Sequence, residues 1–585
     1  MNTNFFVGPN WVPPPDNLTI PQVFLDGTFR HAAVPVETPD IPCMIEEMTG
    51  RKIFITELRA RTQNLARALK EIWNIGDDDN VLMFCPNHTD YPVCIWAAHK
   101  LGASVTTTSP ALTLEEFVHQ LQIAKPSLII ADPLVLALAR KAALSISLPH
   151  TRIVAIGPST LDVVTIDDLI KSGQSLPSFE ERMLAPGEAK SKIAFLCFSS
   201  GTTGKPKAVA ISHHNVVCNA VQVATFKCVN DAYAPWDERQ LKPGDICCSG
   251  TFANFLSGPK INNICASVLP FYHIYGLVIN MHFILLSKIT LVVSQGFDFA
   301  RLLNSISRYR ITTLMLVPPQ VVLFCKHPLA KDADLSSVHY CMIAGAPVTA
   351  ELTKQLRDRL PDVALGQAYG MTETSPGVTM WPVSQRVGTL GSVGRLIAGT
   401  IAKVVKEDGT LAKVDEPGEL YVRGKQNALG YYKNEAATRE VFIDGWVRTG
   451  DHVVFRPNGD LFVIDRIKEI IKVKGFQVAP AELEGHLLSH PKIADAAVIG
   501  IPDEYAGEVP LAFVVLHPET HDQVKNSDQA AADIRAHIFK HISSVLSQYK
   551  WPVGGIKFVE VLPKNQSGKI LRRVLRGQYL PVLGC

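Results

Sequence analysis

The sequence predicts an α/β fold: a large, multi-layered N-terminal domain of sheets and helices, followed by a small α+β C-terminal domain. Three observations predict it. The chain has 585 residues, more than a single core usually holds. Short apolar runs alternate with segments of helical periodicity up to about residue 465, which is typical of a parallel sheet covered on both faces. A charge-dense stretch then begins, and the chain beyond it has the length of a separate small domain.

The first elements are predicted in order along the chain. Residues 1–30, rich in Pro and Asn, are expected to wrap the surface as an extended lead. Residues 81–84 form a short apolar strand, and residues 89–101 have the pattern of a helix. Thr113 and Glu116 have the spacing of a capping box before the next helix. Residues 128–130 are the next predicted strand.

The later part of the chain divides into two predicted domains, residues 1–465 and 466–585. Residues 225–265 are the least regular part of the first and are expected to be an insertion. The second domain has the patterns of a helix near 481–489, strands near 496–501 and 511–516, and a helix near 530–545.

Composition excludes some functions and favours an intracellular protein. The net charge of +2 gives no broad attraction to nucleic acid or to anionic membranes. The twelve cysteines form no C-x-x-C pair and no zinc spacing, so they are expected to be reduced thiols. We find no signal peptide, and the apolar run 274–286 is too short to span a bilayer. A cytoplasmic location is therefore expected; a peroxisomal one stays open, although the last three residues are not the usual signal.

The segment 199–207 is the strongest local signal for chemistry. It comes after an apolar strand at 193–198 and contains two glycines, four hydroxyl side chains and two lysines. Glycines let successive backbone N–H groups converge on a phosphate, and hydroxyls and lysines add donors. The spacing is not that of Walker A. The alternative interpretation is a polar surface turn.

Six further segments strengthen the phosphate interpretation. They are 269–273, 366–373, 445–451, 465–469, 472–477 and 563–569. In this order, together with 199–207, they resemble the adenylate-forming superfamily of acyl-CoA synthetases, luciferases and peptide-synthetase adenylation domains. Residues 273–275 and 472–484 are most similar to the 4-coumarate–CoA ligase group. The resemblance implies a mobile C-terminal domain and the substrates ATP, with Mg²⁺, and coenzyme A.

The resemblance assigns a set of residues to ATP and its metal ion. Tyr369 would lie against adenine, Thr372 would hold a phosphate oxygen and Glu373 would face Mg²⁺, although Thr372 and Glu373 could instead cap a helix. Asp451 would accept the ribose hydroxyls, with Arg466 beside it; a turn aspartate and a surface ion pair are the alternatives. The full set is Ser199, Ser200, Gly201, Thr202, Thr203, Gly204, Lys205, Lys207, Gly345, Ala346, Pro347, Gln367, Ala368, Tyr369, Gly370, Met371, Thr372, Glu373, Asp451 and Arg466.

The resemblance also implies an acyl site. His273 would lie where the acyl site meets the pantetheine tunnel, although a lone histidine in an apolar run is usually a core residue. The other residues implied are Ile274, Tyr275, Ala344, Ala368, Pro376 and Gly377. Alanine at 208, 344 and 368 stands where relatives often have glycine, and Gly377 stands where coumarate ligases are bulkier. Ala344 and Ala368 should narrow one wall of the site, and Gly377 should open another.

The C-terminal domain carries the remaining implied residues. Lys569 would touch both the acyl carboxylate and the α-phosphate, where an ammonium group stabilises developing charge; the alternative is a solvated lysine in a basic run. Lys468 would be the hinge, and Lys472 would serve the second half-reaction. Coenzyme A would run along Lys474, Gly475, Phe476 and Gln477.

The function implied is an ATP-dependent acid–CoA ligase that works through an acyl-adenylate. Aryl, arylalkyl and medium-chain acids all remain open. The alternatives are an enzyme that loads a carrier protein, an oxygenase of luciferase type and a non-catalytic nucleotide binder. A nucleic-acid binder is disfavoured by the charge balance. A monomer or weak homodimer is expected.

Overall fold

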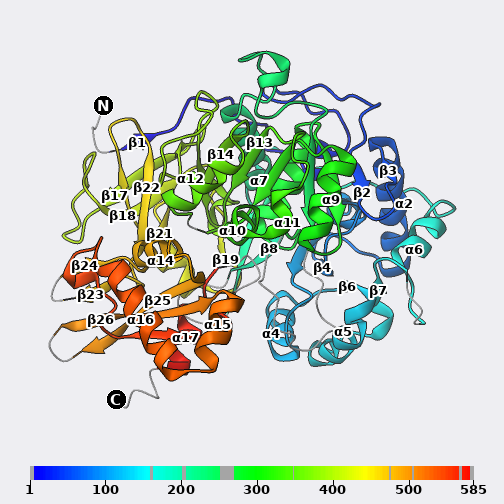
Figure 1. Ribbon diagram of the computed structural model, residues 1–585. Helices are drawn as coiled ribbons and strands as arrows, with labels where there is room; N and C mark the ends of the chain where they lie inside the picture. The colour runs from blue at the N-terminus through cyan, green and yellow to red at the C-terminus, as the bar shows by residue number, and fades with distance from the viewer. Residues whose placement is uncertain are drawn as a thin grey trace.

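The computed structural model describes residues 5–158, 162–199, 206–250, 269–346, 348–473, 476–503, 506–564 and 569–579. Within these ranges the chain forms four sheets with helices packed on them (Figure 1). Three of the sheets belong to the part before residue 467, and the fourth belongs to the part after residue 470.

The first large sheet has seven strands, and its parallel core follows the predicted β/α alternation. The strand order is β19-β9-β8-β5-β4-β6-β7, in which β9 and β19 are antiparallel. The strands are β4 (Asn80–Phe84), β5 (Ser104–Thr108), β6 (Leu128–Ala131), β7 (Ile153–Ala155), β8 (Ile193–Ser199), β9 (Lys207–Ser212) and β19 (Gly430–Tyr431). Its helices include α2 (Ile55–Trp73), α3 (Tyr91–Lys100), α4 (Leu114–Ala124), α5 (Leu136–Ala143) and α6 (Ile166–Gly173). The capping box predicted at Thr113 and Glu116 is present at the start of α4.

The second large sheet has nine strands in the order β16-β15-β14-β13-β12-β10-β11-β2-β3. They are β2 (Met44–Glu46), β3 (Lys52–Ile53), β10 (Ile246–Gly250), β11 (Thr290–Ser294), β12 (Thr313–Leu316), β13 (Tyr340–Ile343), β14 (Ala364–Gly370), β15 (Gly377–Met380) and β16 (Arg395–Leu396). The expectation that residues 225–265 are an insertion is wrong for β10, which lies between β11 and β12 in the middle of the sheet. After Ile246 its sequence is Cys-Cys-Ser-Gly, which lacks the branched apolar residues by which a central strand is usually recognised.

Helices cover both faces of this nine-stranded sheet. One face packs against α7 (His213–Phe226), the π-helix η6 (Tyr275–Phe283) and α8 (Ile284–Leu286). The other packs against α9 (Phe299–Tyr309), α10 (Pro318–Lys326) and α12 (Ala350–Arg359). The apolar run 274–286 is thus core, and no helix in the described ranges is long and apolar enough to cross a membrane.

The third sheet is antiparallel and includes the N-terminal end of the described chain. Its strands are β1 (Phe6–Val7), β17 (Ile401–Val405), β18 (Gly418–Arg423), β20 (Phe442–Ile443), β21 (Trp446–Phe455) and β22 (Leu461–Arg466). The expectation of an extended surface lead for the first thirty residues is only partly right. Phe6 pairs with Ala402 of β17, and the short helix α1 (Ile20–Phe24) is fully buried.

The chain after residue 470 forms a compact unit with its own core, drawn in orange and red (Figure 1). Its sheet contains β23 (Ile471–Val473), β24 (Phe476–Val478), β25 (Ile493–Asp503), β26 (Gly507–Leu516) and β27 (Ile556–Phe558). Its helices are α14 (Pro480–Leu488), α15 (Pro518–Lys525), α16 (Asp528–Ser543) and α17 (Arg572–Tyr579). Two hydrogen bonds join α14 to the larger part: the Ala481 N–H donates to Asp465 Oδ2 at 3.0 Å, and Lys326 Nζ donates to the Leu488 carbonyl at 3.2 Å.

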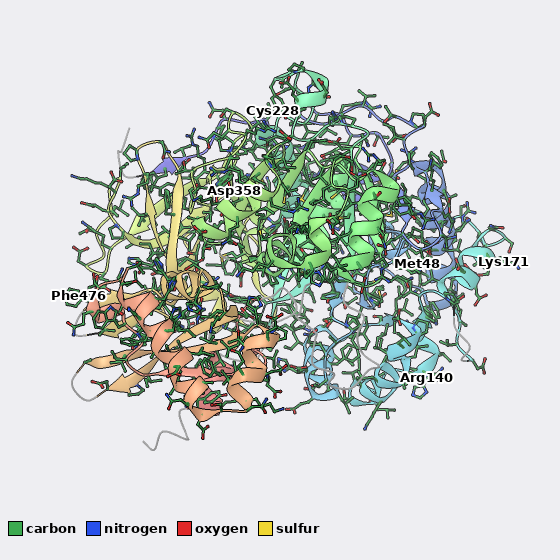
Figure 2. The ribbon with its side chains drawn as sticks, in the orientation of Figure 1. Met48, Arg140, Lys171, Cys228, Asp358 and Phe476 are labelled. Atoms are coloured by element: carbon green, nitrogen blue, oxygen red, sulfur yellow. The ribbon has the colours of Figure 1, made fainter. Side chains whose placement is uncertain are left out.

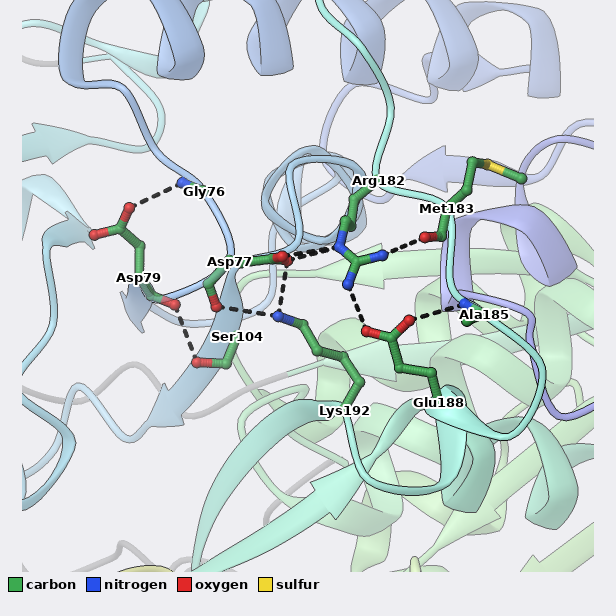
Figure 3. Close-up of polar contacts among 9 residues, drawn as sticks. All are labelled: Gly76, Asp77, Asp79, Ser104, Arg182, Met183, Ala185, Glu188 and Lys192. Carbon is green, nitrogen blue, oxygen red and sulfur yellow. Dashed lines mark hydrogen bonds and ion pairs between the residues drawn. The ribbon is translucent and has the colours of Figure 1, made fainter.

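A charged cluster fixes the start of β8, the strand that leads into the 199–207 segment. Lys192 Nζ lies 2.9 Å from Asp77 Oδ1, and Arg182 Nε lies 2.8 Å from Asp77 Oδ2. Arg182 also pairs with Glu188, so one guanidinium joins two carboxylates (Figure 3). These contacts hold the connection before β8 against the loop before β4.

Candidate active site

Glu373 lies in a short 3₁₀ turn (Thr372–Thr374) directly after β14, with its side chain buried. Ser199, the last residue of β8, donates a hydrogen bond through Oγ to Glu373 Oε1 at 3.1 Å. The Tyr431 hydroxyl donates to the same oxygen at 2.8 Å. Burial and the adjacent Glu373 charge raise the pKa of Tyr431 well above its usual value, so the phenol stays a donor. The structure therefore brings together a predicted phosphate-loop residue and the predicted metal ligand.

Asp451 and Arg466 form the second group, on the neighbouring strands β21 and β22. Arg466 Nε lies 2.6 Å from Asp451 Oδ1, and the Tyr369 hydroxyl donates to Asp451 Oδ2 at 2.5 Å. Burial and the Asp451 charge raise the pKa of Tyr369. Burial lowers the pKa of Arg466, but nearby negative charge, from Asp451 first, raises it by more. Both oxygens of Asp451 are thus engaged by cationic or neutral donors.

Lys569 of the small unit lies within electrostatic range of this second group. Burial and the positive charge of Arg466 lower the pKa of Lys569, while Glu469 and Asp451 act in the opposite direction. Lys569 precedes α17, which Arg572 anchors through ion pairs to Glu469 and Glu484. The ammonium group predicted to act in catalysis is therefore close enough to Arg466 and Asp451 of the predicted nucleotide site to be affected by their charges.

His273 comes just before the π-helix η6. Its Nδ1 accepts a hydrogen bond from the Tyr275 N–H at 3.3 Å, so the ring proton of the neutral form lies on Nε2. Burial lowers the pKa of His273 to about 4. The side chain is a neutral imidazole at physiological pH, with one N–H donor.

The predicted acyl residues gather at the carboxyl end of the nine-stranded sheet. Ala344 comes directly after β13 and Ala368 lies in β14, both on the face covered by α7 and η6. Gly345 has a φ of +90°, and a Cβ there would lie 4.0 Å from the Tyr275 ring. The structure contradicts the expectation that the missing side chain of Gly377 widens the acyl site. Asn219 Oδ1 accepts from the Gly377 N–H at 3.1 Å, and its amide fills the space beside this glycine.

Other predicted residues lie apart from these groups. Gln367 points to the opposite face of β14, where its amide donates to Thr353 Oγ1 at 2.9 Å. This correction is explained by strand alternation, because Gly366 and Ala368 occupy the other face. Lys468 and Lys472 are exposed, and Phe476 stacks on Tyr549 at the outer edge of the small unit (Figure 2).

The remaining predicted residues lie either beside these groups or outside the described part of the chain. Lys207 begins β9, with its ammonium 5.1 Å from the centre of the Tyr431 ring. Ala346, Gly370, Met371, Ile274 and Pro376 lie in or beside the strand ends and turns already described. Ser200, Gly201, Thr202, Thr203, Gly204, Lys205, Pro347, Lys474 and Gly475, and the side chain of Gln477, lie outside the described residues.

Sequence reasoning missed Tyr431 and Asn219. Tyr431 reaches Glu373 only because β19 pairs with β9, more than 200 positions earlier in the chain. Asn219 lies within α7, and nothing in its local sequence distinguishes it from other buried polar residues of that helix. Both depend on long-range packing.

Comparison with known proteins identifies the family. Residues 29–432 match the model of the AMP-binding enzyme family, and residues 482–569 match that of the AMP-binding enzyme C-terminal domain. A 4-coumarate–CoA ligase of Oryza sativa subsp. japonica (4-coumarate--CoA ligase 2) is 33% identical, over 94% of this chain and 91% of its own. The acyl-CoA ligase easD of Emericella nidulans is 31% identical, over 98% and 99%.

Solved structures have the same fold. The anthranilate CoA ligase AuaEII in complex with anthranoyl-AMP superposes with a TM-score of 0.80 at 22% identity, covering 98% of this chain and 99% of its own. ATP-bound MatB of Rhodopseudomonas palustris gives a TM-score of 0.75 at 24% identity, covering 93% and 97%. The chain belongs to the AMP-binding, adenylate-forming enzyme family and is an acid–thiol ligase of the AMP-forming kind.

Proposed function

We propose that this chain joins a carboxylic acid to coenzyme A in two steps. The residues around Glu373 and around Asp451 bind the nucleotide and its metal ion, and Lys569 acts in catalysis. In the first step, a carboxylate oxygen of the acid attacks the α-phosphorus of ATP, and pyrophosphate leaves. In the second, the coenzyme A thiol attacks the acyl-adenylate carbonyl, and AMP leaves. The observation that carries the proposal is the ion pair between Asp451 and Arg466, whose charges act on Lys569 of the other part of the chain.

The nucleotide binds between the two groups of residues. Asp451 accepts hydrogen bonds from the ribose hydroxyls, since a carboxylate offers two acceptor oxygens to a diol. The diol replaces the Tyr369 hydroxyl, which frees that ring to lie along the base. Arg466 pairs with Asp451 at 2.6 Å and holds its carboxylate in place, and the segment 199–207 holds the phosphates.

Glu373 is the proposed metal ligand. Its buried carboxylate already accepts from Ser199 and Tyr431, so it is held in one orientation and has acceptor capacity to spare. Oxygen ligands of this type suit Mg²⁺, which would neutralise phosphate charge when bound. The Tyr431 hydroxyl orients the Glu373 carboxylate through its hydrogen bond to Oε1.

Lys569 stabilises the first transition state. Its ammonium bridges the acid carboxylate and the α-phosphate while negative charge builds up between them, an interaction that a preorganised donor provides without reorganisation. The partial burial of this lysine strengthens the interaction, because the effective dielectric is lower than in water. His273 offers its Nε2–H at the boundary of the acyl site.

The second step requires the C-terminal domain, residues 466–585, to rotate about Lys468 relative to residues 1–465. Support for this rotation comes from the charges of Arg466 and Asp451 acting on Lys569, while Lys472 and Phe476 are exposed. Rotation would exchange them and bring Lys472, Lys474, Gly475, Phe476 and Gln477 to coenzyme A. One small domain thus serves both steps in turn.

The partners of the reaction are small molecules: an aryl, arylalkyl or medium-chain acid, ATP and coenzyme A. Support for this range comes from the small residues Ala344 and Ala368 and from the ligases to which the chain is similar. We propose a cytoplasmic enzyme, monomeric or weakly dimeric.

An ATP–pyrophosphate exchange screen over aromatic and aliphatic acids tests the first step, and the same acids with coenzyme A test the second. Exchange with an acid and thioester formation with coenzyme A are expected. Exchange without thioester would instead favour a carrier-protein thiol as the acceptor. No exchange with any acid would overturn the proposal.

A further inference from the structure

A row of polar side chains crosses the nine-stranded sheet at the end remote from Ala344. Thr313 of β12 pairs in register with Cys247 of β10 on one side and with Tyr340 of β13 on the other. Strand alternation places all three on the face that α7 and η6 cover, since Met315 and Met342 belong to that core. The rest of this face is almost entirely apolar, so a polar row here is unexpected.

Three buried hydroxyls lie along this strip, and one of them, on Thr313, has no hydrogen-bond partner among the described residues. Thr313 is 0% exposed, and its Oγ1 has no hydrogen-bond partner within the described ranges. Tyr340 is 1% exposed, so its hydroxyl is buried at the same end of the sheet. The Tyr275 hydroxyl, from η6, donates to the sulfur of Met315, a weak acceptor, at 4.0 Å. A buried hydroxyl without a partner is costly, so such a group needs an explanation.

A buried cation lies over the ring of Tyr340. Lys227, at the C-terminal end of α7, is 2% exposed and donates to Gln240 Oε1 at 2.7 Å and to the Trp381 carbonyl at 3.1 Å. Its Nζ lies 4.9 Å from the centre of the Tyr340 ring. Among the residues that the structure describes, no carboxylate pairs with it. Burial lowers the pKa of Lys227 to about 7, so an anion bound beside it would favour the charged form.

The polar row and the predicted acyl site lie at two ends of one strip of the sheet. From Ala344 to Tyr340 is four strand residues, about 13 Å. From Asn219, which holds Gly377, to Lys227 is eight helical residues along α7, about 12 Å. Both elements therefore run from the reacting end to the polar row.

The side chains between the two ends are of an adaptable kind, and a bound ligand would displace them. On β13 and β14 the strip contains Met342 opposite Gly366, and a Cβ on Gly366 would lie 2.5 Å from the Tyr340 hydroxyl oxygen. Met315 lies beside Met342 on β12. Methionine is unbranched and adapts to irregular spaces, and π-helices such as η6 often occur at functional sites.

We propose that Lys227, Tyr340 and Thr313 form the far end of the acyl site and bind a second carboxylate, carried by the substrate acid at the end remote from the activated one. This rests on the proposed function and narrows its substrate class to acids with an anionic oxygen acceptor at about 13 Å. Each of the three side chains can donate a hydrogen bond, and an acceptor-only group matches them. The ligand would both balance the ammonium charge and accept a hydrogen bond from the Thr313 hydroxyl, which has no partner among the described residues.

The test compares straight-chain monocarboxylic acids with dicarboxylic acids of the same length, spanning about 13 Å. The kcat/KM of pyrophosphate exchange is measured for wild type and for Lys227→Met, which keeps the chain length but removes the charge. Wild type is expected to favour the dicarboxylic acid, and Lys227→Met is expected to reduce that preference about 10–100-fold, the range of a hydrogen-bonded charge pair. Lys288→Met, which removes a half-buried lysine outside the cluster, should keep the preference.

Thr313→Val provides a second, structurally gentler test. The substitution preserves shape and removes a hydroxyl that has no partner within the described residues, so the melting temperature should stay the same or rise. The preference for the dicarboxylic acid should nevertheless fall several-fold. If the cluster had a purely structural role, the preference for the dicarboxylic acid would not fall while the melting temperature stayed the same or rose.

Three outcomes would overturn the inference. Wild type could exchange with the plain acids as well as with the dicarboxylic ones, or both variants could lower exchange equally for every acid. Either result would be compatible with the proposed activation of an acid but would contradict the proposed second carboxylate site. Failure of wild type to exchange with any acid would overturn the proposed function, and this inference with it.

Discussion

Asp451 and Arg466 face one another in register on β21 and β22, and their side chains form an ion pair of 2.6 Å. Arg466 is at the end of the last strand of the larger part, two residues before the predicted hinge at Lys468. The Tyr369 hydroxyl completes the group from β14 of another sheet. One small cluster therefore ties the nucleotide site to the segment about which the small unit is proposed to move.

Replacing Lys569 with Ala should slow adenylation about 10²–10³-fold, because the transition state loses one preorganised donor. Pyrophosphate exchange with a competent acid measures this directly. Arg573→Ala is the matched control, since it removes an exposed cation from the same basic run. If the two substitutions slowed adenylation equally, the effect would come from the positive charge of the basic run as a whole and not from Lys569 in particular.

Replacing Lys468 with Pro should leave adenylation largely intact and slow thioester formation. Proline fixes φ and removes a backbone donor, so it restricts rotation about this position. Single-turnover measurements of the two half-reactions separate the effects, with Lys468→Ala as the control for the lost charge. The hinge assignment fails if both half-reactions decline together.

Replacing Tyr431 with Phe should raise the Mg²⁺ concentration needed for half-maximal exchange about tenfold. The phenol holds Glu373 Oε1 at 2.8 Å, and loss of such an orienting partner typically weakens metal binding on this scale. A Mg²⁺ titration at saturating ATP and acid is the measurement. An unchanged Mg²⁺ dependence would count against Glu373 as the ligand.

Replacing Arg572 with Met should destabilise the small unit by about 3–5 kcal/mol, because it leaves the buried Glu484 carboxylate without its ion pair at 2.7 Å. Burial already raises the pKa of Glu484, although Arg572 opposes this. A carboxyl whose folded-state pKa lies above its unfolded-state value destabilises the fold when ionised, and the penalty disappears as the pH falls through the folded-state pKa. Without Arg572 that pKa rises further.

The loss of unfolding free energy in Arg572→Met should therefore be largest at neutral pH and should become smaller on acidification, as measured by denaturant unfolding. Adding Glu484→Gln should restore much of the lost stability at pH 7. A deficit independent of both pH and Glu484 would assign the loss to packing of the arginine side chain.

The sequence allowed prediction wherever a function depends on a short contiguous segment. The strand before Ser199, the capping box at Thr113 and the order of the two parts can be derived from local patterns. Glu373, Asp451, Arg466 and Lys569 were identified by resemblance within such segments, and the structure brings them to one region.

The features that could not be predicted depend on partners far apart in the chain. Tyr431 meets Glu373 through the pairing of β19 with β9, and Asn219 fills the space beside Gly377 from a helix more than 150 positions away. The central strand β10 lacks an apolar pattern because its neighbours, and not its own composition, stabilise it. Gln367 was assigned to the site by its segment, although strand alternation turns its side chain away.

The most direct test of the central claim is oxygen transfer from the acid to AMP. A competent acid labelled with ¹⁸O in its carboxylate is incubated with the enzyme, ATP, Mg²⁺ and coenzyme A, and the products are analysed by mass spectrometry. If the carboxylate attacks the α-phosphate, each AMP formed carries one labelled oxygen and the pyrophosphate carries none. Label in inorganic phosphate, or AMP without label, would contradict acid activation through an acyl-adenylate.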